Sequence, residues 1–260
     1  ADAILLIAPE CHSIYTDVCQ WIDAFAYKLL SPDIAFVRLA GDKWACHQLL
    51  IDATIPTPPT MLVAAGAAVD VMELDRHGIT FPIVIKPVDG AGSEQIEFIE
   101  TIETSQRASA WAADSRSGAN HQSGSERLQI ATKMLIQSFV AGTPVSVSAI
   151  VSLSGPPKIL PPTGQRFDAD PIGEYVDAKY PLPADVANRA TELARQTLAV
   201  LPPTRGYLGI DMVISHGDST RDVVIEINPR LTLSYISLRT ILADNLAAMM
   251  IAAAERSRRV

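Results

Sequence analysis

The sequence predicts a mixed α/β protein. Apolar, strand-like runs recur through the 260 residues and are joined by short polar or glycine turns. Residues 184–200 instead repeat apolar side chains at helical spacing. The 48% hydrophobic composition is ample for a buried core. We therefore expect an α/β protein made of α+β lobes.

The first unit is expected over residues 1–55 and opens as a strand followed by helices. Ile4 to Ala8 form an apolar run typical of a buried parallel strand, and apolar residues recur at helical spacing after Pro9. A second helix is predicted from Asp42 to about Asp52, and it ends at "IPTPPT", whose prolines favour an extended chain. Because the chain opens on a strand-like run without an initiating Met, we expect preceding residues to be missing and this unit to be truncated.

Two further units are expected, over residues 56–140 and 141–260. The first contains "PIVIKPVDGAGSEQIEFIE", which indicates two strands around a glycine turn, and the second contains the strands "VSVSAIV", "GYLGIDMVIS" and "RDVVIEINPR". Residues 105–127 are rich in Ser, Ala, Gly and Asn, so we expect a helix and then a mobile loop there. The apolar tail from Leu233 to Arg256 is expected to form one packed helix.

Charge and cysteine content exclude several classes of protein. The formal net charge of -8 and the acidic composition argue against a nucleic-acid-binding surface. The longest apolar run, Leu246 to Ala254, is far shorter than the roughly 20 residues that span a bilayer. Three cysteines, an odd number without CxxC spacing, fit a reducing compartment. We therefore expect a cytoplasmic protein without nucleic-acid or membrane partners.

Oxygen-bearing side chains gather on the hairpin predicted from the last two strands. Side chains of a strand alternate between its faces, so Glu226, Asn228 and Arg230 share one face. Asp211 lies on the preceding strand across a short polar turn and can pair beside Glu226. Carboxylate and carboxamide oxygens suit Mg²⁺ (or Mn²⁺) better than Zn²⁺, which favours His and Cys. One such acid would more simply be a solvated strand end, but together Asp211, Glu226 and Asn228 indicate a metal site.

With these residues in view, the chain resembles the ATP-grasp superfamily, whose motifs it matches in the expected order. The matching stretches are "GDKWACHQLL…IPTPPT", "PIVIKPVDGAGS", "MLIQSFVAG", "GYLGIDMV" and "VIEINPR". The resemblance implies an ATP-grasp fold, in which two antiparallel-sheet lobes sandwich ATP behind a partial Rossmann-like N-terminal domain. It also implies a reaction in which ATP activates a carboxylate as an acylphosphate for attack by an amine.

The resemblance further implies how individual residues hold ATP. Lys43 and Lys86 correspond to two lysines that contact the phosphates, and Arg230 to an arginine that stabilises the transferred phosphoryl group. "DGAGS" corresponds to a glycine loop that closes over the phosphates, and "IQSFV" to a hinge whose backbone pairs with adenine. Taken alone, a glycine pair is more often an ordinary turn, and "IQSFV" a plain core strand. The implied cofactor-binding residues are Lys43, Lys86, Gly90, Gly92, Ser93, Gln137, Ser138, Phe139 and Val140, and the implied catalytic residues are Lys86 and Arg230.

Further stretches resemble one branch of the superfamily. "ADAILLIAPE", "GQRF" and "EINPRLTLSY" are similar to proteins related to tyramine-glutamate ligase, which acts in assembly of furan-type one-carbon carriers such as methanofuran. This resemblance implies a ligase that joins an acidic amino acid, glutamate, to tyramine or tyrosine. Three alternatives stay open: another ATP-grasp amino-acid or dipeptide ligase, a carboxylase-type member of the superfamily, and a nucleotide-binding regulator without catalysis. The expected partners are small-molecule acids and amines, and the oligomeric state, including a homodimer, is left open.

Overall fold

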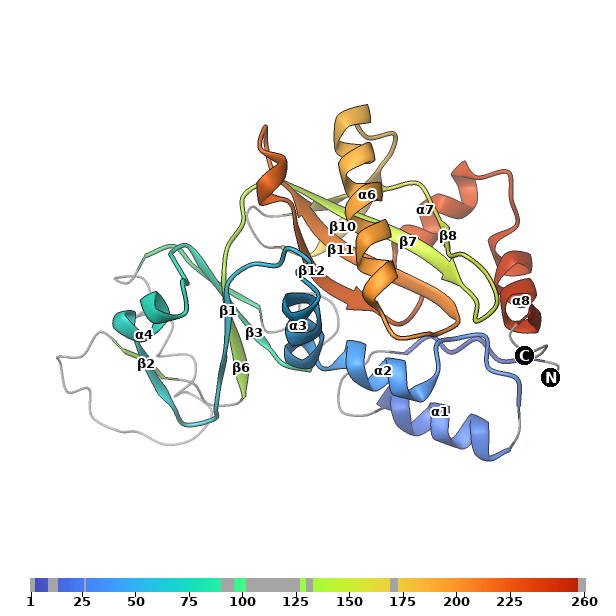
Figure 1. The fold of residues 1–260 in the computed structure, drawn as a ribbon, viewed down its shortest axis with the longest axis horizontal. Coiled ribbons are helices and arrows are strands. Elements are labelled where there is room, and N and C mark those ends of the chain that lie inside the picture. Colours follow the sequence, from blue (N-terminus) through green and yellow to red (C-terminus); the bar gives the residue numbers. More distant parts are fainter. Residues whose placement is uncertain are drawn as a thin grey trace.

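A computed structural model of the protein describes residues 3–8, 14–25, 27–89, 96–101, 127–129, 133–168 and 173–256. Helices and antiparallel sheets alternate along this elongated molecule, which confirms the predicted mixed α/β class (Figure 1). The glycine turn, apart from Asp89, and the helix and loop expected over residues 105–127, apart from Arg127, lie outside the described residues. The unit boundaries at residues 55 and 140 stay a prediction.

A four-stranded antiparallel sheet, here called the small sheet, forms one end of the molecule (Figure 1). Its order is β1 (Thr60–Val63), β6 (Met134–Ser138), β3 (Ile83–Pro87) and β4 (Glu97–Ile99). The predicted pairing of the two strands that flank the glycine turn, β3 and β4, is confirmed. Helix α4 (Val71–Arg76) packs on its core, and β2 (Ala68–Asp70) pairs with β5 (Arg127–Gln129) nearby.

A second antiparallel sheet, the large sheet, contains the predicted acidic hairpin. Its order is β10 (Tyr175–Lys179), β9 (Thr163–Phe167), β7 (Thr143–Val151), β11 (Gly206–Ile214) and β12 (Val223–Asn228), with β8 (Lys158–Ile159) beside β7. A 3₁₀ turn, η2 (Ser219–Arg221), connects β11 to β12. These strands match the runs "VSVSAIV", "GYLGIDMVIS" and "RDVVIEINPR", so the local patterns identified them correctly.

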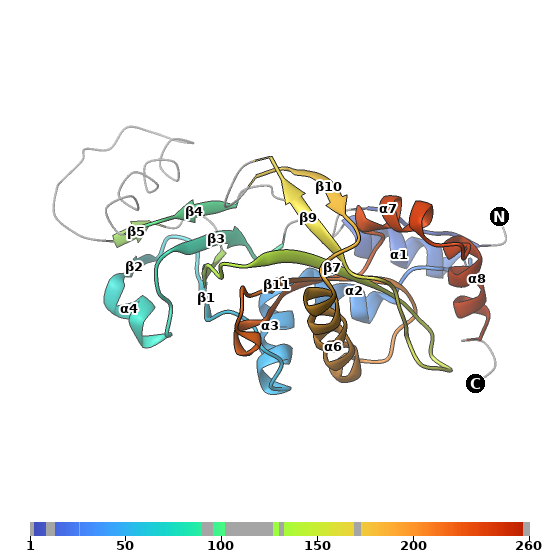
Figure 2. The ribbon, with the colours of Figure 1, turned by 90° about the horizontal axis from the view of Figure 1, so that it is seen from above.

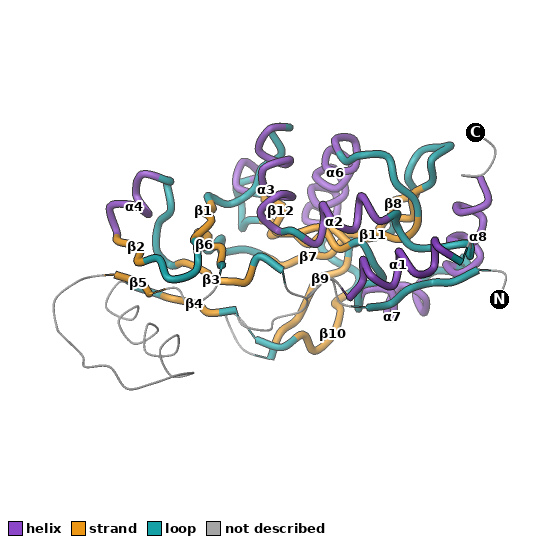
Figure 3. The backbone as a smooth tube through the Cα atoms, turned by 90° about the horizontal axis from the view of Figure 1, so that it is seen from below, coloured by secondary structure: helices purple, strands orange, loops and turns teal. Residues whose placement is uncertain are grey.

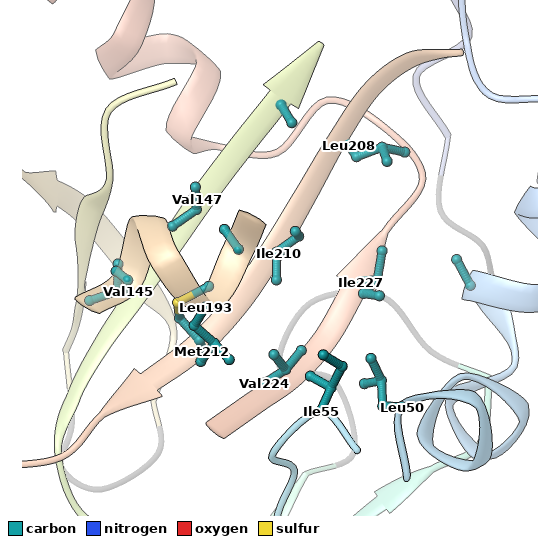
Figure 4. Packing of buried hydrophobic residues seen from close by; sticks show 14 of the residues in the cluster. Leu50, Ile55, Val145, Val147, Leu193, Leu208, Ile210, Met212, Val224 and Ile227 are labelled. Atoms are coloured by element: carbon teal, nitrogen blue, oxygen red, sulfur yellow. The ribbon is translucent and has the colours of Figure 1, made fainter. Parts of the chain in front are cut away.

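Helix α6 (Ala184–Val200) covers one face of the large sheet. Its buried stripe, including Leu193, packs against Val145 and Val147 of β7 and against Ile210 of β11 (Figure 4). The helical spacing of residues 184–200 predicted this stripe. Helices α3 (Lys43–Asp52) and α6 lie on one side of the molecule, while β9 and β10 lie on the other (Figures 2 and 3). The opposite face of the sheet packs in part against the tail helices, residues 234–256, through Ile150 and Tyr207, and Asp211 lies on the rest of that face.

The N-terminal region consists mainly of helices. Helix α1 (Ile14–Ala24) forms where helical spacing predicted a helix, but it buries Tyr15, Cys19 and Ile22, whereas Ile14 and Trp21 of the predicted stripe are exposed. Helix α3 (Lys43–Asp52) coincides with the predicted second helix. Helix α2 (Ile34–Gly41) was not predicted, although the Asp33 carboxylate caps it by accepting a hydrogen bond from the Phe36 N–H (3.1 Å). The strand expected at residues 4–8 is wrong, because the described residues there form only an isolated parallel bridge between Ile4 and Leu29.

The single helix expected for the tail is also wrong. The chain forms α7 (Ser234–Ile241) and α8 (Leu246–Arg256), which meet at a bend of 105°. Leu242 is extended, and the Asn245 side chain starts α8 by accepting a hydrogen bond from the Ala248 N–H (3.1 Å). Among the described residues no single helix is long and apolar enough to cross a membrane, and only this bent pair reaches the required length and composition.

Burial of His47 makes the stability of the fold depend on pH. The ring lies in α3 at 4% exposure, stacks on Trp44 with centroids 5.5 Å apart, and shares a hydrogen bond with Thr57 (3.3 Å). Burial, with a smaller contribution from the nearby Lys86 charge, lowers the pKa of His47 from 6.5 to about 4. The folded protein therefore keeps this imidazole neutral under conditions in which an unfolded chain would protonate it.

Acidification from pH 7 to pH 5 should therefore lower the free energy of unfolding through His47. At His47 the unfolded state binds a proton below about pH 6.5, whereas the folded state does so only near pH 4. The free energy of unfolding should therefore fall by about 2 kcal/mol between pH 7 and pH 5. Urea unfolding at both pH values should show a smaller loss in His47→Gln than in the wild type. The exposed His77→Gln is the control, and equal losses in all three proteins would contradict the prediction.

Candidate active site

Strands β11 and β12 bring the predicted acidic residues together. Asp211 pairs directly with Glu226, and Gly209 pairs with Asn228, in antiparallel register. The Asn228 side-chain amide donates hydrogen bonds to Asp211 Oδ2 (3.0 Å) and to Glu226 Oε1 (3.3 Å). The predicted adjacency of these three side chains is therefore confirmed.

A β-bulge at Ile225 gives the site its shape. The register passes from Asp211–Glu226 to Met212–Val224, so Ile225 has no counterpart on β11. As a result Val224 and Ile227 both enter the core that contains α3 and α6 (Figure 4). Ile225 and Glu226 instead line a cavity. A strict two-residue alternation would have placed Val224 on the same face as Glu226.

The surroundings shift the pKa values of the two acidic side chains in opposite directions. Burial, together with repulsion from Glu226, raises the pKa of Asp211 to about 6. Burial acts in the same direction on Glu226, but the positive charges of Lys43 and Lys86 outweigh it and hold the pKa of Glu226 below its ordinary value. A cation held between the two carboxylates would offset their repulsion.

Two lysines from separate segments complete this charged cluster. Lys43 Nζ lies 3.4 Å from Glu226 Oε2. Asp42 caps α3 by accepting hydrogen bonds from Trp44 and Ala45, and the Lys43 N–H donates to the carbonyl of Val88 (3.1 Å), just beyond β3. The start of α3 is thereby tied to the end of the strand that carries the second lysine.

Lys86, the second lysine, is buried within β3. Its side chain is 4% exposed, and its ammonium donates to Gln137 Oε1 (3.0 Å). Burial lowers the pKa of Lys86 to about 8, although Glu226 acts in the opposite direction. The cluster thus places two cationic side chains around one acidic pair.

A cavity of about 290 Å³ separates the small sheet from the large sheet. The predicted hinge residues line it from β6 and the segment that follows, and the acidic hairpin lines it from the opposite side. The predicted residues that line it are Lys86, Gln137, Ser138, Phe139, Val140, Asp211, Glu226, Asn228 and Arg230. Lys43 lines an adjoining cavity of about 10 Å³ together with Lys86, Gln137 and Glu226. Gly90, Gly92 and Ser93 lie outside the described residues.

Several cavity residues were missed by the sequence reasoning. Gln165 of β9 donates a hydrogen bond to Asp211 Oδ1 (3.3 Å), and the rings of Phe167 and Tyr175 meet at 84° with centroids 6.3 Å apart. The motif "GQRF" was noticed only as a resemblance, although alternation within it places Gln165 and Phe167 on one face. The Gln137 side chain was also missed, because only its backbone was expected to matter.

The donor set fits a hard divalent cation. Asp211 and Glu226 offer carboxylate oxygens, and Asn228 would offer its Oδ1 after a half-turn of the amide that now donates to both acids. Among the described residues there is no cluster of three or more His, Cys, Asp and Glu, so this set depends on the carboxamide. Such an oxygen set favours Mg²⁺ or Mn²⁺ over Zn²⁺.

Millimolar Mg²⁺ should therefore stabilise the protein against heat through Asp211. Binding to the folded state alone adds about 2.7 kcal/mol when the ion is present at 100 times its Kd. Asp211→Asn should lose most of the Mg²⁺-dependent rise in Tm, measured by differential scanning fluorimetry with and without EDTA. Asp185→Asn, at an exposed position on α6, should keep it. A rise of the same size in Asp211→Asn and the wild type would contradict a cation site at Asp211.

Comparison with known proteins places this site in context. A family model described as the ATP-grasp domain matches residues 40–234. The chain is 26% identical over 242 residues to a tyramine–L-glutamate ligase from Methanocaldococcus fervens, covering 92% of the chain and 62% of that protein. It is 24% identical over 212 residues to a D-alanine–D-alanine ligase from Xylella fastidiosa, covering 80% and 64%. The chain thus spans less than two thirds of the length of either relative.

A solved structure shares the fold. The D-alanine–D-alanine ligase from Bacillus anthracis, complexed with ATP, superposes with a TM-score of 0.64 at 18% identity, covering 93% of the chain and 75% of that structure. At this identity the likeness concerns the fold alone.

Proposed function

Because the chain belongs to the ATP-grasp domain family, we propose that it acts as an ATP-dependent ligase that joins a carboxylate to an amine. The observation that carries this proposal is the acidic pair Asp211–Glu226, which faces Lys86 in a cavity between two antiparallel sheets. Mere nucleotide binding would not require an acidic pair beside two lysines and an arginine.

The proposed chemistry follows from the poor reactivity of a carboxylate toward an amine. A carboxylate oxygen attacks the γ-phosphorus of ATP, ADP leaves, and an acylphosphate forms. The amine nitrogen then attacks the carbonyl carbon, phosphate leaves, and the nitrogen loses a proton. The tasks of the protein are to hold the reactants in line and to neutralise charge on the transferred group.

We assign the charged residues to these tasks. Lys43 and Lys86 would hold phosphate oxygens, and Arg230 would stabilise the phosphoryl group in transfer with its planar guanidinium. Asp211, Glu226 and Asn228 would hold Mg²⁺ or Mn²⁺, which supplies positive charge to the phosphates when bound. The segment Gln137–Val140 would pair with adenine, and the loop with Gly90, Gly92 and Ser93 would cover the phosphates.

For the substrates we propose glutamate and a small aromatic amine, tyramine or tyrosine. The support is the similarity to a tyramine–L-glutamate ligase and the ring pair Phe167–Tyr175, which lines the cavity and offers aromatic faces to a phenol ring. Such a product would serve the assembly of furan-type one-carbon carriers, including methanofuran.

ADP formation should require both an acid and an amine. We expect ATP turnover with glutamate plus tyramine or tyrosine to exceed turnover with glutamate plus butylamine, or with D-alanine alone. Mass spectrometry should detect an amide whose mass equals acid plus amine minus water. An amide made only from other pairs would reject the proposed substrates, and ATP binding without any substrate-dependent turnover would instead support a nucleotide-binding regulator.

Arg230→Lys should lower kcat by about 10² or more, equivalent to roughly 3 kcal/mol, because an ammonium cannot reproduce the two-pronged contact of a guanidinium with an oxyanion. The Kd for ATP, measured by calorimetry, should change much less, since the lysines and the hinge remain. Arg239→Lys on α7 makes the same chemical change at an exposed position and is the control. If the Kd for ATP rose by the same factor as kcat fell, Arg230 would instead bind ATP in the ground state.

A further inference from the structure

A chain of buried hydrogen bonds crosses three strands of the small sheet and ends at Lys86. The Thr60 hydroxyl donates to the carbonyl of Pro58 (2.8 Å), and the Gln137 amide donates to Thr60 Oγ1 (2.8 Å). Lys86 Nζ then donates to Gln137 Oε1 (3.0 Å). Thr60, Gln137 and Lys86 are exposed by 7%, 5% and 4%, so the chain of bonds lies inside the protein.

The order of donors and acceptors in this chain has only one consistent direction. A hydroxyl carries one proton, and Thr60 gives its proton to Pro58, so its oxygen can only accept from Gln137. The Gln137 NH₂ must therefore point to Thr60, which leaves its Oε1 for the ammonium of Lys86. With the amide turned over, two donors would face each other at Lys86 and two acceptors at Thr60.

The sheet makes the chain of bonds rigid. Thr60 lies directly opposite Gln137 in the pairing of β1 with β6, and Lys86 lies on β3, the next strand. The carbonyl of Pro58, which accepts the proton of the Thr60 hydroxyl, belongs to a proline-rich stretch whose fixed φ angles restrict the backbone. The position of the Lys86 ammonium is thus set by groups that have little freedom to move.

We propose that Thr60 and Gln137 are positioning residues that aim the Lys86 ammonium at the phosphates of a bound nucleotide. This inference rests on the proposed ATP-dependent function. Lys86 and Gln137 line both the 290 Å³ cavity and the adjoining 10 Å³ cavity, so both residues border the space proposed for the nucleotide. An ammonium has three donors, and the bond to Gln137 leaves capacity for phosphate oxygens.

A purely structural role for these residues makes a different prediction. If the bonds only stabilised the small sheet, breaking them would loosen the binding of any ligand in the cavity alike. If they aim Lys86, breaking them should weaken only ligands that carry phosphates. The comparison of ADP with adenosine separates the two, because the ligands share the base and the sugar.

Thr60→Val removes the hydroxyl with little change of volume and is the informative variant. In calorimetry with Mg²⁺ present, it should weaken ADP binding about tenfold and change adenosine binding less than twofold. Thr60→Ser keeps the hydroxyl and should restore ADP binding. Thr197→Val removes another buried hydroxyl, one that donates to the Leu193 carbonyl in α6, and controls for a general loss of stability.

A double-mutant cycle connects the effect to Lys86. In a Lys86→Met background, Thr60→Val should cause no further loss of ADP affinity, because the group that it positions is gone. An additive loss, or equal weakening of ADP and adenosine by Thr60→Val, would overturn the positioning role. If Thr60→Val does not fold, Thr60→Cys keeps the volume with a poorer acceptor and should show the same selective loss to a smaller extent. A wild-type protein that binds adenosine and ADP equally would reject the proposed function itself, since its phosphate site would be absent.

Discussion

The direct opposition of Asp211 and Glu226 across β11 and β12 is the constraint around which the rest of the site is arranged. Two carboxylates at neighbouring positions repel each other, and burial strengthens that repulsion. A positive charge and hydrogen-bond donors reduce this repulsion. Lys43 Nζ lies 3.4 Å from Glu226, the Asn228 amide donates to both acids, and Gln165 donates to Asp211. The repulsion between the two carboxylates that these groups leave uncompensated would be offset by a bound cation.

Each compensating group comes from a different part of the chain, and the framework fixes each of them separately. Asp42 starts α3 and thereby sets the backbone of Lys43, whose N–H is held by Val88. Farther off, the Tyr15 hydroxyl, fully buried in α1, donates to the carbonyl of Pro229 (3.1 Å), between Asn228 and Arg230. The N-terminal helices therefore contact the end of β12, next to Asn228 and Arg230. Elements outside the two sheets thus help to hold residues of the proposed site.

The two sheets contribute different properties to the cavity between them. Helix α6 covers one face of the large sheet, and α7 and α8 cover part of the other, so polar side chains occupy only the uncovered part that lines the cavity. The small sheet contributes the predicted hinge segment and Lys86, whose ammonium is hydrogen-bonded to Gln137 on the neighbouring strand. A ligand held between them would contact rigid elements on both sides, which favours accurate placement of reacting atoms.

The sequence by itself determined strands β3, β4, β7, β11 and β12, the stripe of α6 and the acidic pair, because each depends on alternation or spacing over short stretches. A short turn joins β11 to β12, so the register of Asp211 with Glu226 follows from local pattern. Only the tertiary structure decided the bulge at Ile225, the 105° break in the tail and the hydrogen bonds of Gln137. The bulge allows Val224 and Ile227 to pack in the same core as α6, which the sequence of β12 alone does not show. Gln137 is hydrogen-bonded to residues 51 and 77 positions away, separations over which periodicity carries no information.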